Sequence, residues 1–413
     1  MSRPWAGEDA RAPEAFEAGI TGQNLSATPF VTRENWLHPQ NLRWALRHSR
    51  QVIPTVVVSR GGGLVTDLPR ALLIDLDDTT FIVGDQALRL DQYLQSAAVD
   101  AFLVLHRGRV VYERLFEGMT RQQPHQWASM TKSLTGLLAA LLAERGAIDL
   151  TRPLRDYVPE LAASPFGIAT VQQNLDMTVA VDWPLDVTEM HWMAAVGLLP
   201  NPGGVPPTIR EFLPRVGRPA AAPHGAVFRY NNSTTESVAW AMCNATGKPW
   251  QALVSDEIWS KLGAEQDATV IVDSAGTAQA SGGFSSTVGD LARFAEALRL
   301  AGRIDGRQAL AANAISRALS PHTGNAGAIA VQAFAHGNIA VGRRGFSYRN
   351  GFFHVHDKSG SVQMSGRFGQ RVHINPATEM TVVQFGAYPG PGDETAGAFL
   401  AAMQAIAARL GGT

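Results

Sequence analysis

Apolar residues along the chain form strand-like runs toward both ends and helical patterns between them. Two short apolar runs, at residues 101–105 and 110–112, flank an Arg-Gly pair and predict a β-hairpin. Residues 370–374 and 380–385 form two more strand-like runs, and a helix is expected after them at residues 395–410. Strands that are separated by a helical block predict an α+β protein, in which the block is inserted between the two halves of one sheet.

The strongest helical pattern starts at Thr131 and ends at Gly146, a residue type that commonly terminates helices. It contains the segment LTGLLAALLA, which is apolar on nearly every face and predicts a buried helix. Helices are also expected at residues 235–246 and 288–301, each followed by a glycine. Eleven of the 23 prolines fall between residues 150 and 225 and predict short elements with long loops there.

We expect the chain to form one body with an extension at its N-terminus. Trp5, Trp36 and Trp44 lie in a stretch without clear periodicity, and such large side chains need a surface on which to pack. The expected parts are an extension at residues 1–99, a sheet domain at residues 100–150 and 296–413, and an inserted, mostly helical lobe at residues 151–295.

The composition is that of a folded protein without an excess of charge. Of the 413 residues, 45% are hydrophobic and 17% are charged, which excludes disorder for most of the chain. The net charge of −1 comes without a basic stripe, so nucleic acid is not expected as a partner. Residues 1–19 lack the apolar core of a signal peptide, and the longest apolar stretch, residues 137–143, is too short to span a bilayer. We therefore expect a cytoplasmic protein without a membrane partner.

A serine and a lysine at the start of the buried helix are the first candidates for chemistry. The chain contains four lysines, and only Lys132 has a serine, Ser129, three residues before it. Helix residues three apart share a face, so the Ser129 hydroxyl and the Lys132 amine can meet. Burial lowers the pKa of a lysine, and a neutral amine can accept the proton of a serine. In the alternative interpretation, Ser129 only caps the helix and Lys132 extends to solvent.

Such a pair commonly works with a Tyr-x-Asn motif about a hundred residues further along the chain. Two segments match, Tyr230-x-Asn232 and Tyr348-x-Asn350. We favour Tyr230 and Asn232, because the second segment lies too close to the next candidate element to form a separate wall of the same site. The asparagines of the first segment can also cap the helix that follows, which is compatible with this role.

A third element, a strand in which a small residue precedes a glycine, would supply a backbone N–H to a substrate oxygen. The candidate is Ser365-Gly366, where the glycine lets a substrate approach the backbone and the N–H of Arg367 can bind an oxyanion. Phe368-Gly369 is a second pair of residues that could form this element, and the sequence leaves both possibilities open.

Together these motifs resemble the serine β-lactamase-like family, which includes class C β-lactamases, penicillin-binding proteins and related esterases and amidases. The likeness runs from about residue 100 to the C-terminus and, within the family, is greatest to the amidases that act on nylon oligomers. It rests on the segments DAFLVLHRGRVVYE, Ser129-x-x-Lys132, GAIDLTRPLRDYVPEL, Tyr230-x-Asn232, ASGGFSSTVGDLARF and FGQRVHINP.

The resemblance implies an antiparallel sheet flanked by helices, with the site between this sheet and an inserted helical lobe. It implies that Ser129 is the nucleophile and that Lys132 and Tyr230 carry protons. Asn232 would orient the substrate, and the backbone N–H groups of Ser129 and Arg367 would stabilise the oxyanion. No cofactor is implied.

Three positions depart from the family pattern: one argues against a β-lactam as substrate, and the other two favour an ester over an amide. Met364 replaces the lysine with which β-lactamases hold a carboxylate. Val187 stands where the amidases carry an assisting tyrosine, and Phe368 replaces a histidine. Trp183 and Trp192 are aromatic candidates for lining the substrate pocket, with a role in the core as the alternative.

We therefore expect a serine hydrolase that cleaves a carboxylic ester or a small linear amide. The alternatives are a non-catalytic ligand-binding or sensor protein on the same fold, and a true β-lactamase or DD-peptidase. His354 and His356 share a face if they lie on a strand, but no pattern of zinc ligands accompanies them, so no metal is expected. A small molecule is the expected partner, and the formation of a homodimer stays open.

Overall fold

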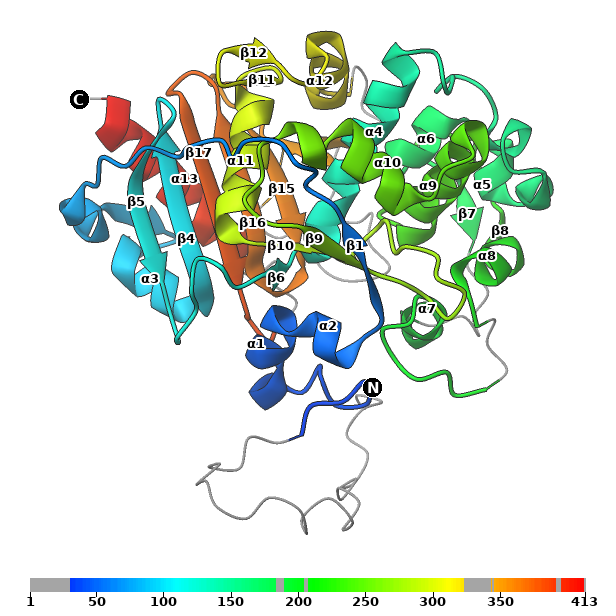
Figure 1. Ribbon diagram of the computed structural model, residues 1–413, viewed down its shortest axis with the longest axis horizontal. Coiled ribbons are helices and arrows are strands. Elements are labelled where there is room, and N and C mark those ends of the chain that lie inside the picture. The colour runs from blue at the N-terminus through cyan, green and yellow to red at the C-terminus, as the bar shows by residue number, and fades with distance from the viewer. Residues whose placement is uncertain are drawn as a thin grey trace.

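The largest element of the molecule is a seven-stranded antiparallel sheet that lies beside a group of helices (Figure 1). The computed structural model describes residues 30–182, 189–203, 207–322, 343, 345–390 and 395–411. The sheet has the order β13-β14-β15-β16-β17-β4-β5, so that a hairpin from the first half of the chain pairs with strands from its end. The α+β class expected from the sequence is confirmed. The strands are β4 (Val99–His106), β5 (Arg109–Leu115), β13 (Ser347–Arg349), β14 (Phe352–His354), β15 (Val362–Gly366), β16 (Gln370–Asn375) and β17 (Met380–Gly386).

Helices cover both faces of this sheet (Figure 1). Phe102 of β4 belongs to a hydrophobic cluster with α3 (Leu90–Ser96) and α13 (Ala396–Gly411) on one face. Its neighbour Leu103 belongs to the main core on the other face, where α11 (Val288–Arg299) packs. Because successive side chains of a strand point to opposite faces, a strand that is covered on both sides is apolar throughout. The boundary expected at residue 296 falls inside α11, which contacts β4, β16 and β17 of the sheet.

Most of the remaining helices form a lobe beside α4 (Thr131–Glu144), and most of these are short, as the prolines predict. Among the described residues, no helix is both long enough and apolar enough to cross a membrane. The helices of the lobe and its flank are α5 (Pro165–Ile168), α6 (Val171–Leu175), α7 (Glu189–Ala195), α8 (Ile209–Phe212), α9 (Asn232–Thr246), α10 (Trp250–Glu257) and α12 (Ala312–Leu319). The short 3-10 helices are η2 (Ile74–Asp78), η3 (Ala128–Met130), η4 (Leu154–Asp156), η5 (Pro159–Leu161), η6 (Leu213–Arg215), η7 (Trp259–Lys261) and η9 (Arg367–Gly369).

A second sheet, which the sequence patterns do not predict, has four short antiparallel strands in the order β1-β9-β10-β6. It joins the N-terminal part of the chain to the segment that precedes α4. Its strands are β1 (Thr55–Val58), β6 (His125–Gln126), β9 (Ala268–Ile271) and β10 (Phe284–Ser286). Three two-stranded pairs complete the described strands: β2 (Thr80–Val83) with β3 (Gln86–Arg89), β7 (Val181–Asp182) with β8 (Arg218–Pro219), and β11 (Arg303–Ile304) with β12 (Arg307–Gln308).

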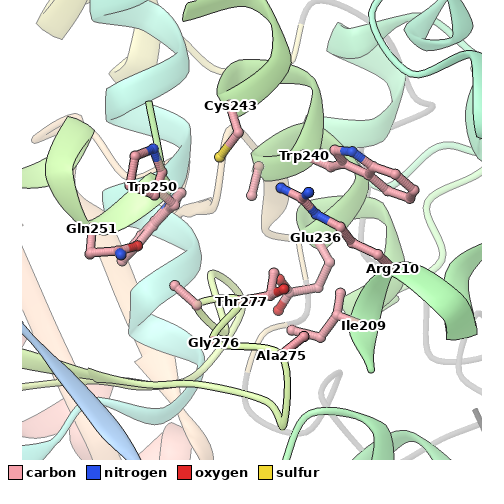
Figure 2. Close-up of a pocket in the computed structure, with 13 residues that line it drawn as sticks. Ile209, Arg210, Glu236, Trp240, Cys243, Trp250, Gln251, Ala275, Gly276 and Thr277 are labelled. Atoms are coloured by element: carbon pink, nitrogen blue, oxygen red, sulfur yellow. The ribbon is translucent and has the colours of Figure 1, made fainter. Parts of the chain in front are cut away.

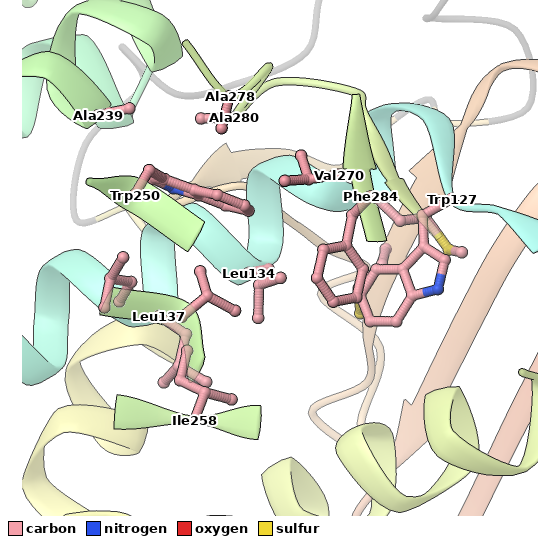
Figure 3. Close-up of a cluster of buried hydrophobic side chains, with 14 of the residues drawn as sticks. Trp127, Leu134, Leu137, Ala239, Trp250, Ile258, Val270, Ala278, Ala280 and Phe284 are labelled. Atoms are coloured by element: carbon pink, nitrogen blue, oxygen red, sulfur yellow. The ribbon is translucent and has the colours of Figure 1, made fainter. Parts of the chain in front are cut away.

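Helix α4 runs through the hydrophobic core, as the sequence predicts (Figure 3). Every residue from Thr131 to Leu142 is buried. The ring of Trp127, just before the helix, contacts the rings of Phe284 and Trp259 edge to face, at 4.8 and 6.2 Å between ring centroids. These aromatic contacts fix the start of α4 against the four-stranded sheet.

The turn between β13 and β14 packs directly against α4 through two glycines. A Cβ atom added at Gly136 of the helix would overlap the carbonyl group of Asn350 in the turn. One added at Gly351 would overlap the carbonyl group of Lys132, and Gly351 also has a φ of +86°. The Ser133 hydroxyl donates a hydrogen bond of 2.6 Å to the Gly351 carbonyl. The large sheet and α4 are thus held together by contacts between backbones.

From residue 30, the described part of the N-terminal segment packs on the rest of the molecule. Trp36 is buried and donates a hydrogen bond of 2.9 Å from its indole nitrogen to the Leu198 carbonyl. Helices α1 (Pro39–Arg47) and α2 (Ser49–Val52) follow, and the Arg47 guanidinium lies 2.6 Å from the buried carboxylate of Asp100 in β4. Trp5 lies outside the described residues.

We predict that Gly136→Ala destabilises the fold even though alanine favours helices. The new methyl group has no room beside the turn at Asn350, and overpacking of this kind costs about 1–3 kcal/mol in free energy of unfolding. Gly289→Ala in α11 is the matched control, because its methyl group would meet only the Nη1 atom of Arg293, at 3.3 Å, and no backbone atom. Urea unfolding measures both, and equal stability changes in the two variants would contradict the prediction.

Candidate functional site

Ser129 lies where the small sheet ends and α4 begins. The backbone N–H of Trp127 donates to the Phe284 carbonyl at 2.8 Å, which continues the pairing of β6 with β10. Ala128 then adopts a φ of +47°, a left-handed conformation that is uncommon for residues other than glycine. This turn leads into η3, in which Ser129 is only half-buried and can meet a ligand.

The Lys132 amine is buried and faces Ser129. Its Nζ atom donates hydrogen bonds to Ser129 Oγ at 2.9 Å and to the Ser281 carbonyl oxygen at 2.6 Å. Burial lowers the pKa of Lys132 to about 7, and the negative charge of Glu236 limits this decrease. The alternative interpretation, in which Ser129 only caps the helix and Lys132 extends to solvent, is wrong. Lys132 does not reach solvent, and α4 has no side-chain cap.

The Tyr230 ring lies close to the same amine. The Lys132 Nζ atom is 5.0 Å from the centroid of the Tyr230 ring, within the range of a cation–π contact. Asn231 caps α9 by accepting a hydrogen bond of 2.8 Å from the Ser233 N–H, so the helix starts at Asn232, three residues earlier than expected. Asn232 is half-buried in the first turn of α9.

The second match, Tyr348-x-Asn350, serves the packing of the hairpin turn. Tyr348 is 1% exposed and contacts the Tyr230 ring edge to face at 6.1 Å. The Asn350 side chain donates to the carbonyl groups of Arg317 and Ala318 and accepts from Gln172. These contacts support our choice of the first segment, with Tyr348 behind Tyr230.

The end of β15 lies beside Ser129. A Cβ atom added at Gly366 would overlap the Trp127 carbonyl oxygen and lie 3.1 Å from the Ser129 backbone nitrogen. The glycine of the alternative pair, Phe368-Gly369, does not lie beside Ser129. A Cβ atom added at Gly369 would meet the Gln384 side chain, at 3.7 Å. The structure thus brings Gly366, and not Gly369, to Ser129.

Two arginines converge on Ser365, which the sequence did not indicate. Arg343 and Arg371, both 1% exposed, donate hydrogen bonds of 2.7 and 2.6 Å to Ser365 Oγ. Neither arginine stands out in the sequence, because other arginines, such as Arg349 and Arg367, lie close to them in the chain. Arg367 has an exposed side chain that pairs with Glu189 of α7 at 2.9 Å.

Of the two aromatic candidates, Trp192 lies among the described residues. Trp192 of α7 is 8% exposed and contacts Phe212 edge to face at 5.6 Å in the hydrophobic core, which favours the core alternative. Trp183 and Val187 lie outside the described residues. His354 and His356, the candidates for a metal, have ring centroids 6.4 Å apart, and no third side chain of a metal-binding type joins them in the described structure.

Sequence reasoning missed Glu236, a buried carboxylate behind the lysine. It lies on α9, four residues and about one helical turn after Asn232, and accepts hydrogen bonds from the N–H groups of Ala280 and Ser281. Glu236 also borders a cavity of about 170 Å³ (Figure 2). A carboxylate inside a helix that is otherwise buried was the signal available in the sequence.

An antiparallel sheet beside a helical lobe, with a serine and a buried lysine at their junction, defines a serine hydrolase of the β-lactamase type. A protein-family model described as Beta-lactamase matches residues 89–405, and the chain belongs to this family. The resemblance inferred from the sequence motifs is therefore confirmed.

Relatives with a particular activity in their names are also similar over most of the chain. A 6-aminohexanoate-dimer hydrolase from Paenarthrobacter ureafaciens is 29% identical over 387 residues, which cover 91% of this chain and 94% of that protein. A solved structure from Bacillus anthracis, which carries the same name provisionally, has a TM-score of 0.83 and 32% identity over 92% of this chain and 97% of its own.

More distant structures share the fold. The octameric penicillin-binding protein homologue from Pyrococcus abyssi has a TM-score of 0.58 and 19% identity, covering 78% of this chain and 76% of its own. At this level of identity the likeness concerns the fold alone, and the expected β-lactamase-like architecture is confirmed.

Proposed function

We propose that this chain cleaves a carboxylic ester or a small linear amide through an acyl-enzyme on Ser129. The observation that carries the proposal is the hydrogen bond of 2.9 Å between Lys132 Nζ and Ser129 Oγ, made by an amine that is 2% exposed. Because burial lowers the pKa of Lys132 to about 7, a large fraction of the amine is neutral near neutral pH and can accept the serine proton.

The proposed reaction proceeds through an acyl-enzyme in the following steps. Ser129 Oγ attacks the substrate carbonyl carbon while its proton passes to Lys132, and the carbonyl oxygen becomes an oxyanion. The N–H groups of Ser129 and Arg367 are the proposed donors to this oxyanion, since Gly366 lets the two backbones meet. The Tyr230 hydroxyl gives its proton to the leaving group as the bond between this group and the carbonyl carbon breaks, and it takes up in return the proton that Lys132 received from Ser129. Water then hydrolyses the acyl-enzyme and regenerates the Ser129 hydroxyl.

The substrate class is supported by the relatives and by Met364. Two similar proteins are named after the hydrolysis of a linear amide, the 6-aminohexanoate dimer. Met364 is 1% exposed and belongs to the hydrophobic core, so it supplies no charge for the carboxylate of a β-lactam. We therefore favour uncyclised esters and amides over β-lactams.

We predict that Ser129→Ala abolishes turnover and leaves the fold intact. No other group in a covalent mechanism replaces the hydroxyl, so residual activity should stay below about a hundredth of the wild-type rate. Fluorophosphonate labelling, followed by intact mass, should add one adduct to the wild type and none to the variant. A wild type that binds small esters without labelling or turnover would support the non-catalytic sensor alternative instead.

We predict that short-chain p-nitrophenyl esters and the linear 6-aminohexanoate dimer are cleaved faster than nitrocefin. The physical reason is the buried Met364 in the place of a carboxylate-binding lysine. The measurement is kcat/KM for the three substrates with one enzyme preparation. Nitrocefin as the best substrate would show that another cation, such as Arg371, holds its carboxylate, and would contradict the substrate class.

We predict that Tyr230→Phe slows amide cleavage more than cleavage of an activated ester with the same acyl group. An amide nitrogen must be protonated as it leaves, whereas p-nitrophenolate leaves unaided, and general acid catalysis contributes about 10²–10⁴-fold. Tyr348→Phe is the matched control, because Tyr348 lies behind Tyr230. Equal losses on both substrates would assign Tyr230 to the activation of Ser129, and a loss confined to Tyr348→Phe would show that the wrong motif was chosen.

A further inference from the structure

One peptide segment connects a buried carboxylate with the buried amine of the site. The Glu236 side chain, 2% exposed, accepts hydrogen bonds from the N–H groups of Ser281 at 2.9 Å and Ala280 at 3.1 Å, one to each carboxylate oxygen. The carbonyl oxygen of the same Ser281 accepts the hydrogen bond of 2.6 Å from Lys132 Nζ. Glu236 therefore binds the same residue, Ser281, whose carbonyl group binds the Lys132 amine.

This arrangement fixes the direction of the Lys132 side chain. A lysine side chain has four rotatable carbon–carbon bonds, and its amine must point at Ser129 Oγ to accept the proton. The Ser281 carbonyl supplies a second fixed contact for the amine, besides Ser129 itself. A displacement of the carbonyl of about 1 Å is enough to reduce a rate by about 10²-fold in such a geometry.

We propose that Glu236 is a positioning residue for the reaction, which holds the segment of Ala280 and Ser281 so that its carbonyl aims the Lys132 amine at Ser129. The proposal rests on the proposed function, in which Lys132 accepts the proton of Ser129. Glu236 does not touch the reacting atoms and acts through Ser281 and Lys132.

The space beside Glu236 supports a role that is not merely structural packing. The side chain borders the cavity of about 170 Å³ together with Arg210, Trp240 and Thr277 (Figure 2). A carboxylate next to open space is not required to fill the core, and an apolar side chain would fill that space at lower cost. What the carboxylate provides is a pair of acceptors for the two N–H groups and a negative charge near Lys132.

The charges around the pair determine the expected pH dependence. Burial raises the pKa of Glu236 to about 7, while its hydrogen bonds with residues 280 and 281 and the charge of Lys132 oppose the rise. Other titratable groups lie near Glu236 and Lys132. Tyr230 lies against the Lys132 amine, and Arg210 and Cys243 line the cavity beside Glu236. Because the Glu236 charge favours the protonated amine, its removal lowers the pKa of Lys132 further.

The test is the rate at which a fluorophosphonate labels Ser129, measured against pH on both sides of neutrality. Labelling requires the neutral amine, so in the wild type it rises through the pKa of Lys132. In Glu236→Gln the midpoint should move by about one pH unit toward lower pH, because the charge is lost. The plateau rate should fall about tenfold or more, because the amide NH₂ group then faces a backbone N–H and the segment shifts.

Two further variants separate position from charge and from general destabilisation. Glu236→Asp keeps the charge but is too short to reach both N–H groups, so it should lower the plateau and keep the midpoint near that of the wild type. Asp290→Asn is the matched control, since the buried Asp290 of α11 likewise accepts from two loop N–H groups, those of Glu265 and Gln266. None of the described hydrogen bonds links that loop with Lys132, so this variant should lose stability and keep both midpoint and plateau.

The outcomes distinguish the proposals from one another. A wild type that is not labelled at Ser129 overturns the proposed function itself. A labelled wild type with unchanged midpoint and plateau in Glu236→Gln overturns the role of Glu236. If Glu236→Gln does not fold, Glu236→Asp decides, because a wild-type plateau in that variant excludes positioning by the two hydrogen bonds. An equal loss in Asp290→Asn would show that general destabilisation explains the effect.

Discussion

The burial of one amine, that of Lys132, is the constraint on which the site and its surroundings depend. An ammonium group without partners is very costly in a protein interior, so the amine must find acceptors or become neutral. Here it does both, with Ser129 Oγ and the Ser281 carbonyl as acceptors and a pKa that burial lowers to about 7. Helix α4 supplies the apolar surroundings, and the small sheet brings the segment before Phe284 to the amine. The burial that stabilises the core around Lys132 thus also lowers the pKa of its amine.

The second constraint is the close approach of backbones at the junction of the sheet and the helical lobe. Gly136 and Gly351 let the turn of the hairpin β13–β14 lie against α4, and Gly366 lets β15 lie against Ser129. Side chains at these three positions would push the packed elements apart, and the residues of the site would then move away from one another. The junction therefore has little freedom, which suits a reaction whose groups must stay aligned within a fraction of an ångström. The edge-to-face contact between the rings of Tyr348 and Tyr230 adds to this rigidity, because it restricts the position of the Tyr230 ring.

Much of the fold could be predicted because its signals are local. The hairpin at β4–β5, the buried helix α4 and the terminal helix α13 follow from apolar runs and their periods, and their bounds differ by only a few residues from those expected. The four-stranded sheet could not be predicted, since strands of two to four residues are too short for any alternation to show. Its pairing joins β1 with β9, more than two hundred residues later, and only the packed structure brings them together.

The sequence by itself determined the pair of Ser129 and Lys132, because residues three apart in a helix share a face whatever the rest of the chain does. It also indicated Tyr230, through spacing and family resemblance, whereas only the tertiary structure shows that the Tyr230 ring lies 5.0 Å from Lys132 Nζ and that Tyr348 is buried against this ring. The Ser281 carbonyl and its link to Glu236 were decided by tertiary structure alone. A carbonyl group is the same at every residue, so no side chain marks the one that holds a lysine. Its place depends on how elements about 150 residues apart in the sequence pack around a buried charge.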